Sequence, residues 1–229
     1  MLEVVLSSAL VAYILLDVNY FVRMFLTCFA GRYFRPKLGP TDANVTYGIA
    51  LPWDVDTTLD HMNNSKVLRE FDFSRMELGV RTGVVGMVMK KGGGFPVNAN
   101  FIRYRLPVKP FSIFKVESKL LAWDEKHVFI QQSLTTLSDG IVRAVSYPKL
   151  SAAGWNPVEL MDANWPGTVS PSIPTQFENM KEIGDIVSEK FKKVGKKKAE
   201  TYDGTKGSIR DSVGPWKNGG TTEKRDKSI

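Results

Sequence analysis

Several kinds of functional machinery are missing from this sequence. Its 229 residues include one cysteine and two histidines. One cysteine excludes an internal disulfide framework and zinc-finger spacing, and two histidines are too few to expect a transition-metal site built from protein ligands. The chain also lacks the G-x-S-x-G, G-x-x-x-x-G-K and G-x-G-x-x-G motifs of serine hydrolases, phosphate loops and dinucleotide sites. We therefore expect neither a metal nor a cofactor.

Excess charge is also scarce outside the end of the chain. The formal net charge is +7, but residues 181–229 hold 13 basic and 8 acidic side chains, which is +5 of that total. The remainder is close to neutral, so we expect no nucleic-acid partner. Residues 161–229 are predicted to be a basic and largely disordered tail. Its lysine cluster at residues 190–198 is either solvated or attracted to anionic lipid.

An apolar run occupies the N-terminus. Residues 4–16 are apolar apart from two serines, and after Asp17 the pattern continues to residue 22. Residues 2–22 together reach the roughly 20 residues that span a bilayer, and the arginines that follow predict that the rest of the chain faces the cytoplasm. We predict a single-pass membrane anchor at residues 1–26. A cleaved signal peptide, which would make the protein secreted, and a buried or interfacial helix are the alternatives.

The middle of the chain predicts one α+β domain at residues 44–160, joined to the anchor by a proline- and glycine-containing linker at residues 27–43. Apolar spacing indicates one long, largely buried helix at residues 65–81. Segments rich in β-branched and aromatic residues predict strands at residues 44–51, 97–106, 111–123, 126–137 and 141–150. Short helices are predicted at residues 157–161 and 177–193. Short turns favour antiparallel pairing, so the order of elements predicts an antiparallel sheet wrapped around the long helix.

Polar groups gather between the first strand and the long helix. Residues 54–64 contain three aspartates, one of the two histidines and two asparagines. Asn63 or Asn64 is the expected N-cap, because an asparagine side chain accepts hydrogen bonds from the free N–H groups of a first helical turn. Such N–H groups also polarise a carbonyl and stabilise a developing oxyanion, while a nearby carboxylate attacks the carbonyl or activates a water. A thioester suits this apparatus, since a thiolate leaves without strong acid assistance.

The same residues also fit purely structural roles. Asp54 and Asp56 are suited to capping turns, Asp60 to interacting with the helix dipole, and the asparagines to capping the helix. A lone histidine such as His61 is more often a satisfied structural residue than a catalytic one. Spacing alone therefore leaves both interpretations open.

Two groups of residues resemble one known family. Asp54-Val55-Asp56, followed by His61-Met62-Asn63-Asn64 and the start of the long helix, resembles the signature of hotdog-fold acyl-CoA thioesterases of the 4-hydroxybenzoyl-CoA type. Residues 15–23 and 121–124 are similar to the thioesterase superfamily member six family in particular, and the likeness covers residues 1–155. The resemblance implies a hotdog fold, homodimers with sites at the subunit interface, Asp56 as nucleophile or general base, and an endoplasmic reticulum membrane location.

The spacing departs from the family pattern at one point. Relatives usually have three residues between the catalytic acid and the histidine, whereas four separate Asp56 from His61, and Asp60 stands where many hotdog proteins have glycine. The loop either absorbs the extra residue or displaces the carboxylate by up to about 3.5 Å, which would spoil catalytic alignment.

The predicted function is a membrane-tethered thioesterase that hydrolyses acyl-CoA to free acid and CoA. Asp56 is the predicted catalytic residue, and His61, Asn63, Asn64 and Ser65 are predicted to bind the substrate. The alternative is a non-catalytic acyl-CoA or lipid-binding scaffold of the same fold.

Overall fold

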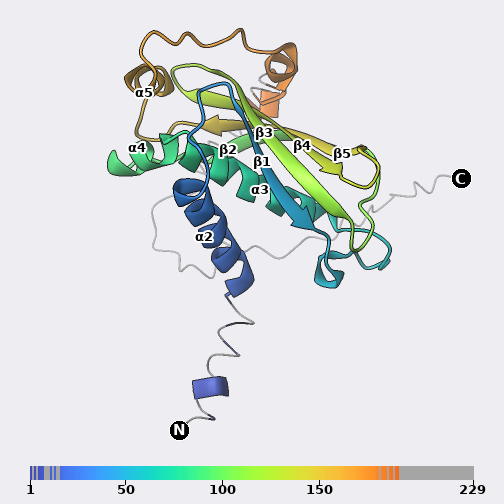
Figure 1. Ribbon diagram of the computed structural model, residues 1–229. Coiled ribbons are helices and arrows are strands. Elements are labelled where there is room, and N and C mark those ends of the chain that lie inside the picture. The colour runs from blue at the N-terminus through green and yellow to red at the C-terminus, as the bar shows by residue number, and fades with distance from the viewer. Residues whose placement is uncertain are drawn as a thin grey trace, which may run out of the picture. The chain divides into compact units, whose positions relative to one another are not determined.

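Residues 16–180 are described without interruption by the computed structural model, which also describes residues 1, 3, 5–7, 11, 13, 182–184, 186, 187, 189 and 190. In chain order the elements are α2 (Val18–Tyr33), β1 (Ala43–Ile49), a 3-10 turn (Pro52–Asp54), α3 (Asn64–Arg81), α4 (Val84–Lys90), β2 (Val97–Tyr104), β3 (Ile113–Trp123), β4 (His127–Thr136), β5 (Val142–Ser151) and α5 (Pro157–Asn164) (Figure 1). Eight positions of the predicted anchor and the basic cluster from residue 191 onward lie outside the described residues.

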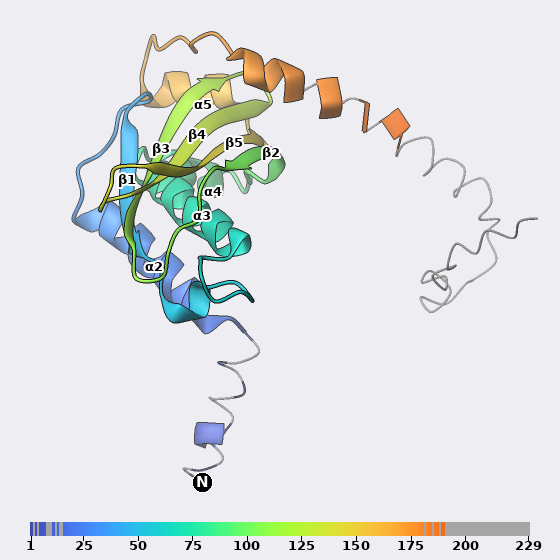
Figure 2. The same cartoon turned by 90° about the vertical axis from the view of Figure 1, so that its right-hand side faces the viewer.

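The five strands form one antiparallel sheet in the order β1-β3-β4-β5-β2. The sheet curves around α3, as Figure 2 shows. Burial alternates along β3, because successive side chains of a strand point to opposite faces and one face packs on the helix. The predicted α+β architecture is confirmed, and each predicted strand agrees with an observed strand to within two residues at either end.

Apolar and polar contacts together fix α3 against the sheet. Phe71 and Phe114 are fully buried in the core between them. The Gln132 amide donates to the Phe71 carbonyl over 2.7 Å and to the Ser118 hydroxyl over 2.8 Å, and Ser118 in turn donates to the Ser74 hydroxyl over 2.8 Å. Each of these polar groups would be costly to bury alone, so the line of hydrogen bonds sets the register between the helix and strands β3 and β4.

Helix α2 packs along a second side of α3. The Arg23 guanidinium forms a bidentate ion pair with the buried Glu70 carboxylate and lies 4.5 Å from the Phe73 ring centroid. Farther along, Arg35 donates to Glu77, which is 2% exposed, over 2.7 Å. Gly31 lies so close to α3 that a Cβ there would be 2.7 Å from the Glu77 side chain. The two helices are therefore held by charge pairs as well as by close packing.

This docking corrects the predicted membrane anchor. Across the described parts of the chain, no helix is both long and apolar enough to cross a bilayer. Residues 18–26, assigned to the anchor, instead begin α2, and Asp17, which precedes them, pairs with Arg69 of α3 over 2.8 Å. Arg23, the basic residue that was expected to follow a membrane span, is the partner of Glu70. The endoplasmic reticulum membrane location expected from the sequence is overturned by the same finding.

Three helical segments differ from the prediction in extent. Helix α4 was not predicted, since the sequence analysis placed no element between residues 81 and 97. Gly83 adopts the left-handed conformation (φ 79°) and is the N-cap of α4. Helix α5 extends beyond the single turn predicted at residues 157–161. Residues 175–180 are helical, and Phe177 is buried against Phe129 and Tyr147.

Replacing Arg23 with alanine is expected to destabilise the fold in a pH-dependent way. Burial raises the pKa of the Glu70 carboxyl, and the nearby Arg23 charge opposes this. Removing the arginine leaves an ionised carboxylate buried without its partner, which we expect to cost about 1–3 kcal/mol of unfolding free energy at pH 7, less than for a fully enclosed pair because Arg23 is 41% exposed.

The sign of the pH effect follows from the raised pKa. The folded protein holds the pKa of the Glu70 carboxyl above its ordinary value of 4.5, so ionising this carboxyl costs folding free energy, and the cost appears as the pH rises above 4.5. The difference between wild type and Arg23→Ala in urea unfolding should therefore be larger at pH 7 than at pH 4, where Glu70 is protonated. Arg32→Ala, an exposed change on the same helix, is the control. An equal difference at both pH values would contradict the role given to the Glu70 charge.

Candidate active site

The loop between β1 and α3 is a short hairpin. Val55 and Met62 pair in an antiparallel bridge. The Asp56 amide donates to the His61 carbonyl over 2.8 Å, and the Leu59 amide turns back to the Asp56 carbonyl over 2.9 Å. Leu59 adopts a left-handed conformation (φ 58°). The four residues between Asp56 and His61 thus form the tip, and the backbones of these two residues are paired directly beneath it.

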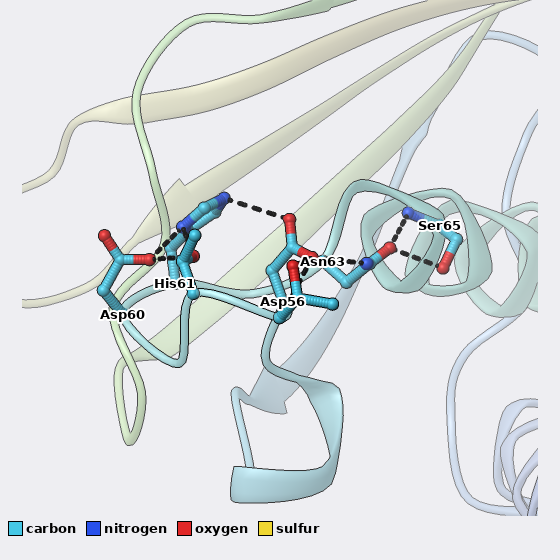
Figure 3. A network of polar contacts seen from close by, with 7 residues as sticks. Asp56, Asp60, His61, Asn63 and Ser65 are labelled. Carbon is cyan, nitrogen blue, oxygen red and sulfur yellow. Dashed lines mark hydrogen bonds and ion pairs between the residues drawn. The ribbon is translucent and has the colours of Figure 1, made fainter.

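The Asp56 side chain is held from several directions. Its Oδ1 accepts from the Thr57 amide over 2.6 Å and from Asn63 Nδ2 over 3.3 Å, while Oδ2 lies 3.7 Å from His61 Nε2 (Figure 3). The Thr57 amide is the main cause of a pKa below the ordinary value for this carboxyl, with smaller contributions from the Thr57 hydroxyl, His61 and Asn63. Asp56 is 31% exposed. It is therefore an accessible, ionised carboxylate at neutral pH.

The cap of α3 leaves one amide group free. Asn63, one of the two asparagines expected to cap the helix, is the N-cap, and its Oδ1 accepts from the Ser65 amide over 2.8 Å. The amides of Lys66 and Val67 donate to the Asn63 carbonyl over 2.9 and 3.2 Å. Among the residues that the structure describes, the Asn64 amide alone in this first turn has no hydrogen-bond acceptor. Because Asn64 is exposed, this N–H is available to a ligand.

Other polar residues of the loop have structural or supporting contacts. Asp54 is buried, accepts from the Leu51 amide over 3.1 Å and lies 3.7 Å from Lys66 Nζ, so it caps the turn after β1. Asp60 is exposed, and its Oδ1 lies 2.5 Å from both Thr58 Oγ1 and His61 Nδ1. Of the three aspartates, Asp54 binds a backbone amide, while Asp56 and Asp60 both face His61.

A cleft of about 400 Å³ lies beside this cluster. Its floor includes the buried residues Met62 and Val67, and its rim includes polar side chains from four segments: Asp60, His61, Asn64, Tyr104, Arg105 and Arg143. The Tyr104 hydroxyl donates to the Asn64 carbonyl over 3.1 Å and so joins β2 to the start of α3. Asp56 is not among the residues that line the cleft; it lies on the other side of His61.

The predicted site residues therefore divide into two groups. His61 and Asn64 line the cleft, whereas Asn63 and Ser65 are engaged with each other in the helix cap. Tyr104, Arg105 and Arg143 were missed by the sequence analysis. They follow the helix by 23 or more residues, and only the curvature of the sheet brings the ends of β2 and β5 to the start of α3. Their one sequence signal, polar residues at strand ends, is too common to single them out.

A larger hollow of about 600 Å³ between α2, β1 and α3 is less suited to a charged ligand. Its charged side chains already pair with one another, as Arg23 with Glu70, Arg69 with Asp17 and Lys66 with Asp54. Within the described part of the chain, no group of three or more metal-ligating side chains lies together. The cleft beside His61 is therefore the better candidate site.

A curved sheet around one long helix, with an acid–histidine–asparagine loop at the start of that helix, defines a thioesterase-like hotdog domain. Residues 50–151 match the Thioesterase-like superfamily. The chain belongs, more narrowly, to the THEM6 (thioesterase superfamily member 6) family. It is 36% identical to Protein THEM6 of Drosophila melanogaster over 185 residues, which cover 80% of this chain and 95% of that one. It is 31% identical to Protein THEM6 of Xenopus laevis over 196 residues, which cover 84% and 94%.

A solved structure agrees with the fold. The putative oleoyl thioesterase of Lactobacillus plantarum superposes with a TM-score of 0.51 at 12% identity, over 58% of this chain and 54% of that one. At such low identity the likeness concerns the fold alone. The hotdog architecture expected from the sequence motif is thus confirmed, together with the family.

The Asn63 cap offers a direct test of the local geometry. Asn63→Ala removes the acceptor for the Ser65 amide and is expected to lower the unfolding free energy by about 1 kcal/mol, as measured by urea denaturation. Asn156→Ala, which removes the cap of α5 at the Val158 amide, is the matched comparison. Both should destabilise the protein, but only Asn63→Ala should alter the NMR signals of His61. A change in the His61 signals of equal size in both variants would contradict the proposed local effect.

Proposed function

We propose that this protein hydrolyses acyl-CoA thioesters to a free acid and CoA. The observation that carries the proposal is the cap of α3, where Nδ2 of the N-cap residue Asn63 donates to the ionised Asp56 carboxylate over 3.3 Å and the next residue, Asn64, has a free backbone amide. An ionised carboxylate and an unoccupied helix N–H in one loop supply the two needs of thioester hydrolysis, a base or nucleophile and a donor for the carbonyl oxygen. The family's thioesterase-like character supports the same reaction.

In the proposed reaction the thioester carbonyl oxygen accepts a hydrogen bond from the Asn64 amide. The positive end of the α3 dipole stabilises the negative charge that develops on this oxygen. Asp56 either takes a proton from the attacking water, whose hydroxyl adds to the carbonyl carbon, or attacks the carbonyl carbon itself. In both routes the carbon–sulfur bond breaks, CoA leaves as a thiolate, and the thiolate takes up the proton that the water gives up. In the second route the acyl group is first held on Asp56 as a mixed anhydride, which a water hydrolyses to the free acid and the regenerated Asp56 carboxylate.

We further propose that the site is completed by a second copy of the chain. Strand β2 is an end strand of the sheet, and Tyr104 and Arg105 at its end border the cleft. A second subunit at this edge would enclose the cleft, in keeping with the interface sites that the family resemblance implies. A sedimentation measurement that finds a monomer at concentrations where the enzyme is active would reject this part of the proposal.

Asp56→Asn is the decisive variant for catalysis. The change preserves shape but removes the charge, and we expect thioester hydrolysis to fall by about 100-fold or more. The rate is measured as free thiol released by the full chain from acyl-CoAs ranging from acetyl to palmitoyl. Asp42→Asn, a change to a carboxylate that binds only the nearby Gly39 amide, should leave the rate unchanged.

A lack of turnover by the wild-type protein with every acyl-CoA would reject the enzyme proposal. If acyl-CoA nevertheless raises the thermal unfolding temperature, and does so equally in the Asp56→Asn variant, the protein is a non-catalytic acyl-CoA-binding scaffold. The scaffold alternative has a structural reason behind it, because Asp56 lies beside the cleft and is not one of the residues that line it.

Arg105 is expected to contribute to the binding of the anionic CoA part. Its neighbour Arg143 is already paired with Asp139, whereas the Arg105 guanidinium forms no ion pair within the described residues and donates to the Val142 carbonyl over 3.4 Å. An exposed charge contact is worth up to about 1 kcal/mol, so Arg105→Ala should raise KM about 2- to 5-fold at low salt with little change in kcat. Arg103→Ala, an exposed arginine of β2 outside the cleft, is the control. Equal effects of the two changes would contradict a specific contact.

A further inference from the structure

The His61 ring lies between two carboxylates. Its Nδ1 is 2.5 Å from Asp60 Oδ1, and its Nε2 is 3.7 Å from Asp56 Oδ2 (Figure 3). The first distance is that of a short, charge-assisted hydrogen bond, whereas the second is too long for a hydrogen bond. The contact with Asp60, and not the contact with Asp56, therefore sets the orientation of the ring.

Asp60 is itself held in place although it is exposed. Its side chain is 72% exposed, so burial does not fix it. The Thr58 hydroxyl donates to Asp60 Oδ1 over 2.5 Å, and the same hydroxyl lies 3.5 Å from His61 Nδ1. These hydrogen bonds, that of Thr58 first and that of His61 second, lower the pKa of the Asp60 carboxyl. Asp60 is thus a negatively charged acceptor in a fixed place at neutral pH.

We propose that Asp60 is a positioning residue, which holds a proton on His61 Nδ1 and turns His61 Nε2 toward Asp56. A neutral imidazole carries one N–H, and the hydrogen bond at one ring nitrogen decides the state of the other. With Nδ1 protonated, Nε2 is left as an acceptor on the side of the catalytic carboxylate. The inference rests on the proposed thioesterase function and adds to it a residue outside the predicted site.

The orientation has a chemical consequence. When Asp56 takes a proton from the attacking water, the 3.7 Å separation from His61 Nε2 shortens to hydrogen-bond distance in the substrate complex. The proton then passes to His61 Nε2, and from there it neutralises the departing CoA thiolate. The hydroxyl of the water remains on the acyl carbon as part of the free acid, so atoms and charge balance. Because His61 lines the cleft and Asp56 lies behind it, the ring is in the right place to connect the two.

The extra residue of the loop makes this arrangement possible. Asp60 occupies the position before the histidine where the resemblance to hotdog thioesterases leads us to expect glycine, which has no side chain to hold the ring. The four-residue tip, with its turn at Leu59, brings the Thr58 and Asp60 side chains together. The departure in spacing thus supplies a contact that a glycine would lack.

The experiment compares Asp60→Asn and Asp60→Gly in the full chain. We expect kcat to fall about 10-fold in Asp60→Asn and further in Asp60→Gly, with KM changed less than 2-fold. The nitrogen and carbon NMR signals of the His61 ring should shift away from the Nδ1-protonated form. Thermal unfolding temperatures should remain close to wild type, because Asp60 is exposed.

The chain contains its own control for this measurement. Its other histidine, His127, has Nδ1 3.2 Å from Asp124 Oδ2, at the turn between β3 and β4. Asp124→Asn should change the His127 signals while leaving kcat and the His61 signals unaltered. An unchanged kcat in Asp60→Gly, or a His61 ring that keeps its Nδ1 proton in that variant, would overturn the inference.

Failure of the proposed function can be told apart from failure of this inference. If the wild-type protein hydrolyses no acyl-CoA, the thioesterase proposal fails, and with it any effect of Asp60 on turnover. The NMR comparison still decides whether Asp60 holds the His61 ring, since it needs no substrate. If the wild type is active and Asp60→Gly is equally active, the inference alone is rejected.

Discussion

Helix α3 is enclosed on two sides by different kinds of contact. On the side facing the sheet, apolar side chains pack around the buried hydrogen bonds of Ser74, Ser118 and Gln132. The side facing α2 carries the carboxylates of Glu70 and Glu77, which are almost fully buried. Buried carboxylates are tolerated only with partners, so α3 needs Arg23 of α2 and Arg35, which follows α2, as much as it needs the sheet. The arginine contacts and the sheet contacts together fix the orientation of α3 and so the direction in which its N-terminus points.

The candidate site depends on that direction. The capping contacts of Asn63 occupy the next amides of α3 and leave the Asn64 amide free, beside a cleft whose walls come from the ends of β2 and β5. Since the helix cannot rotate without breaking buried hydrogen bonds or ion pairs, the free amide is preorganised with respect to the cleft. Preorganised donors are effective because they require no rearrangement as charge develops. The rigidity of the core thus serves the chemistry at its edge.

The sequence predicted the parts of the fold that local patterns specify. β-Branched and aromatic residues indicated the strands, helical spacing indicated α3, and the capping preference of asparagine narrowed the N-cap to Asn63 or Asn64, of which the structure uses Asn63. Residues 18–26 of α2 were assigned to an anchor because hydropathy does not reveal that the partner of Arg23 lies 47 residues farther along the chain. Tyr104 and Arg105 were missed for the same reason. The sequence could not show which amide of α3 is free either. That depends on which amides donate to the side-chain oxygen of Asn63 and which donate to its carbonyl oxygen.

The extra residue between Asp56 and His61 has a smaller effect on geometry than its length implies. An added residue displaces a chain by about 3.5 Å if the backbone stays extended, but here the chain turns back on itself. The hydrogen bond from the Asp56 amide to the His61 carbonyl closes the loop, and the left-handed turn at Leu59 takes up the added length. The backbones of Asp56 and His61 therefore stay paired, and the added residue lengthens only the tip of the loop. Because Asp60 in that tip contacts the ring of His61, the insertion changes which group orients the histidine more than it changes where the carboxylate lies.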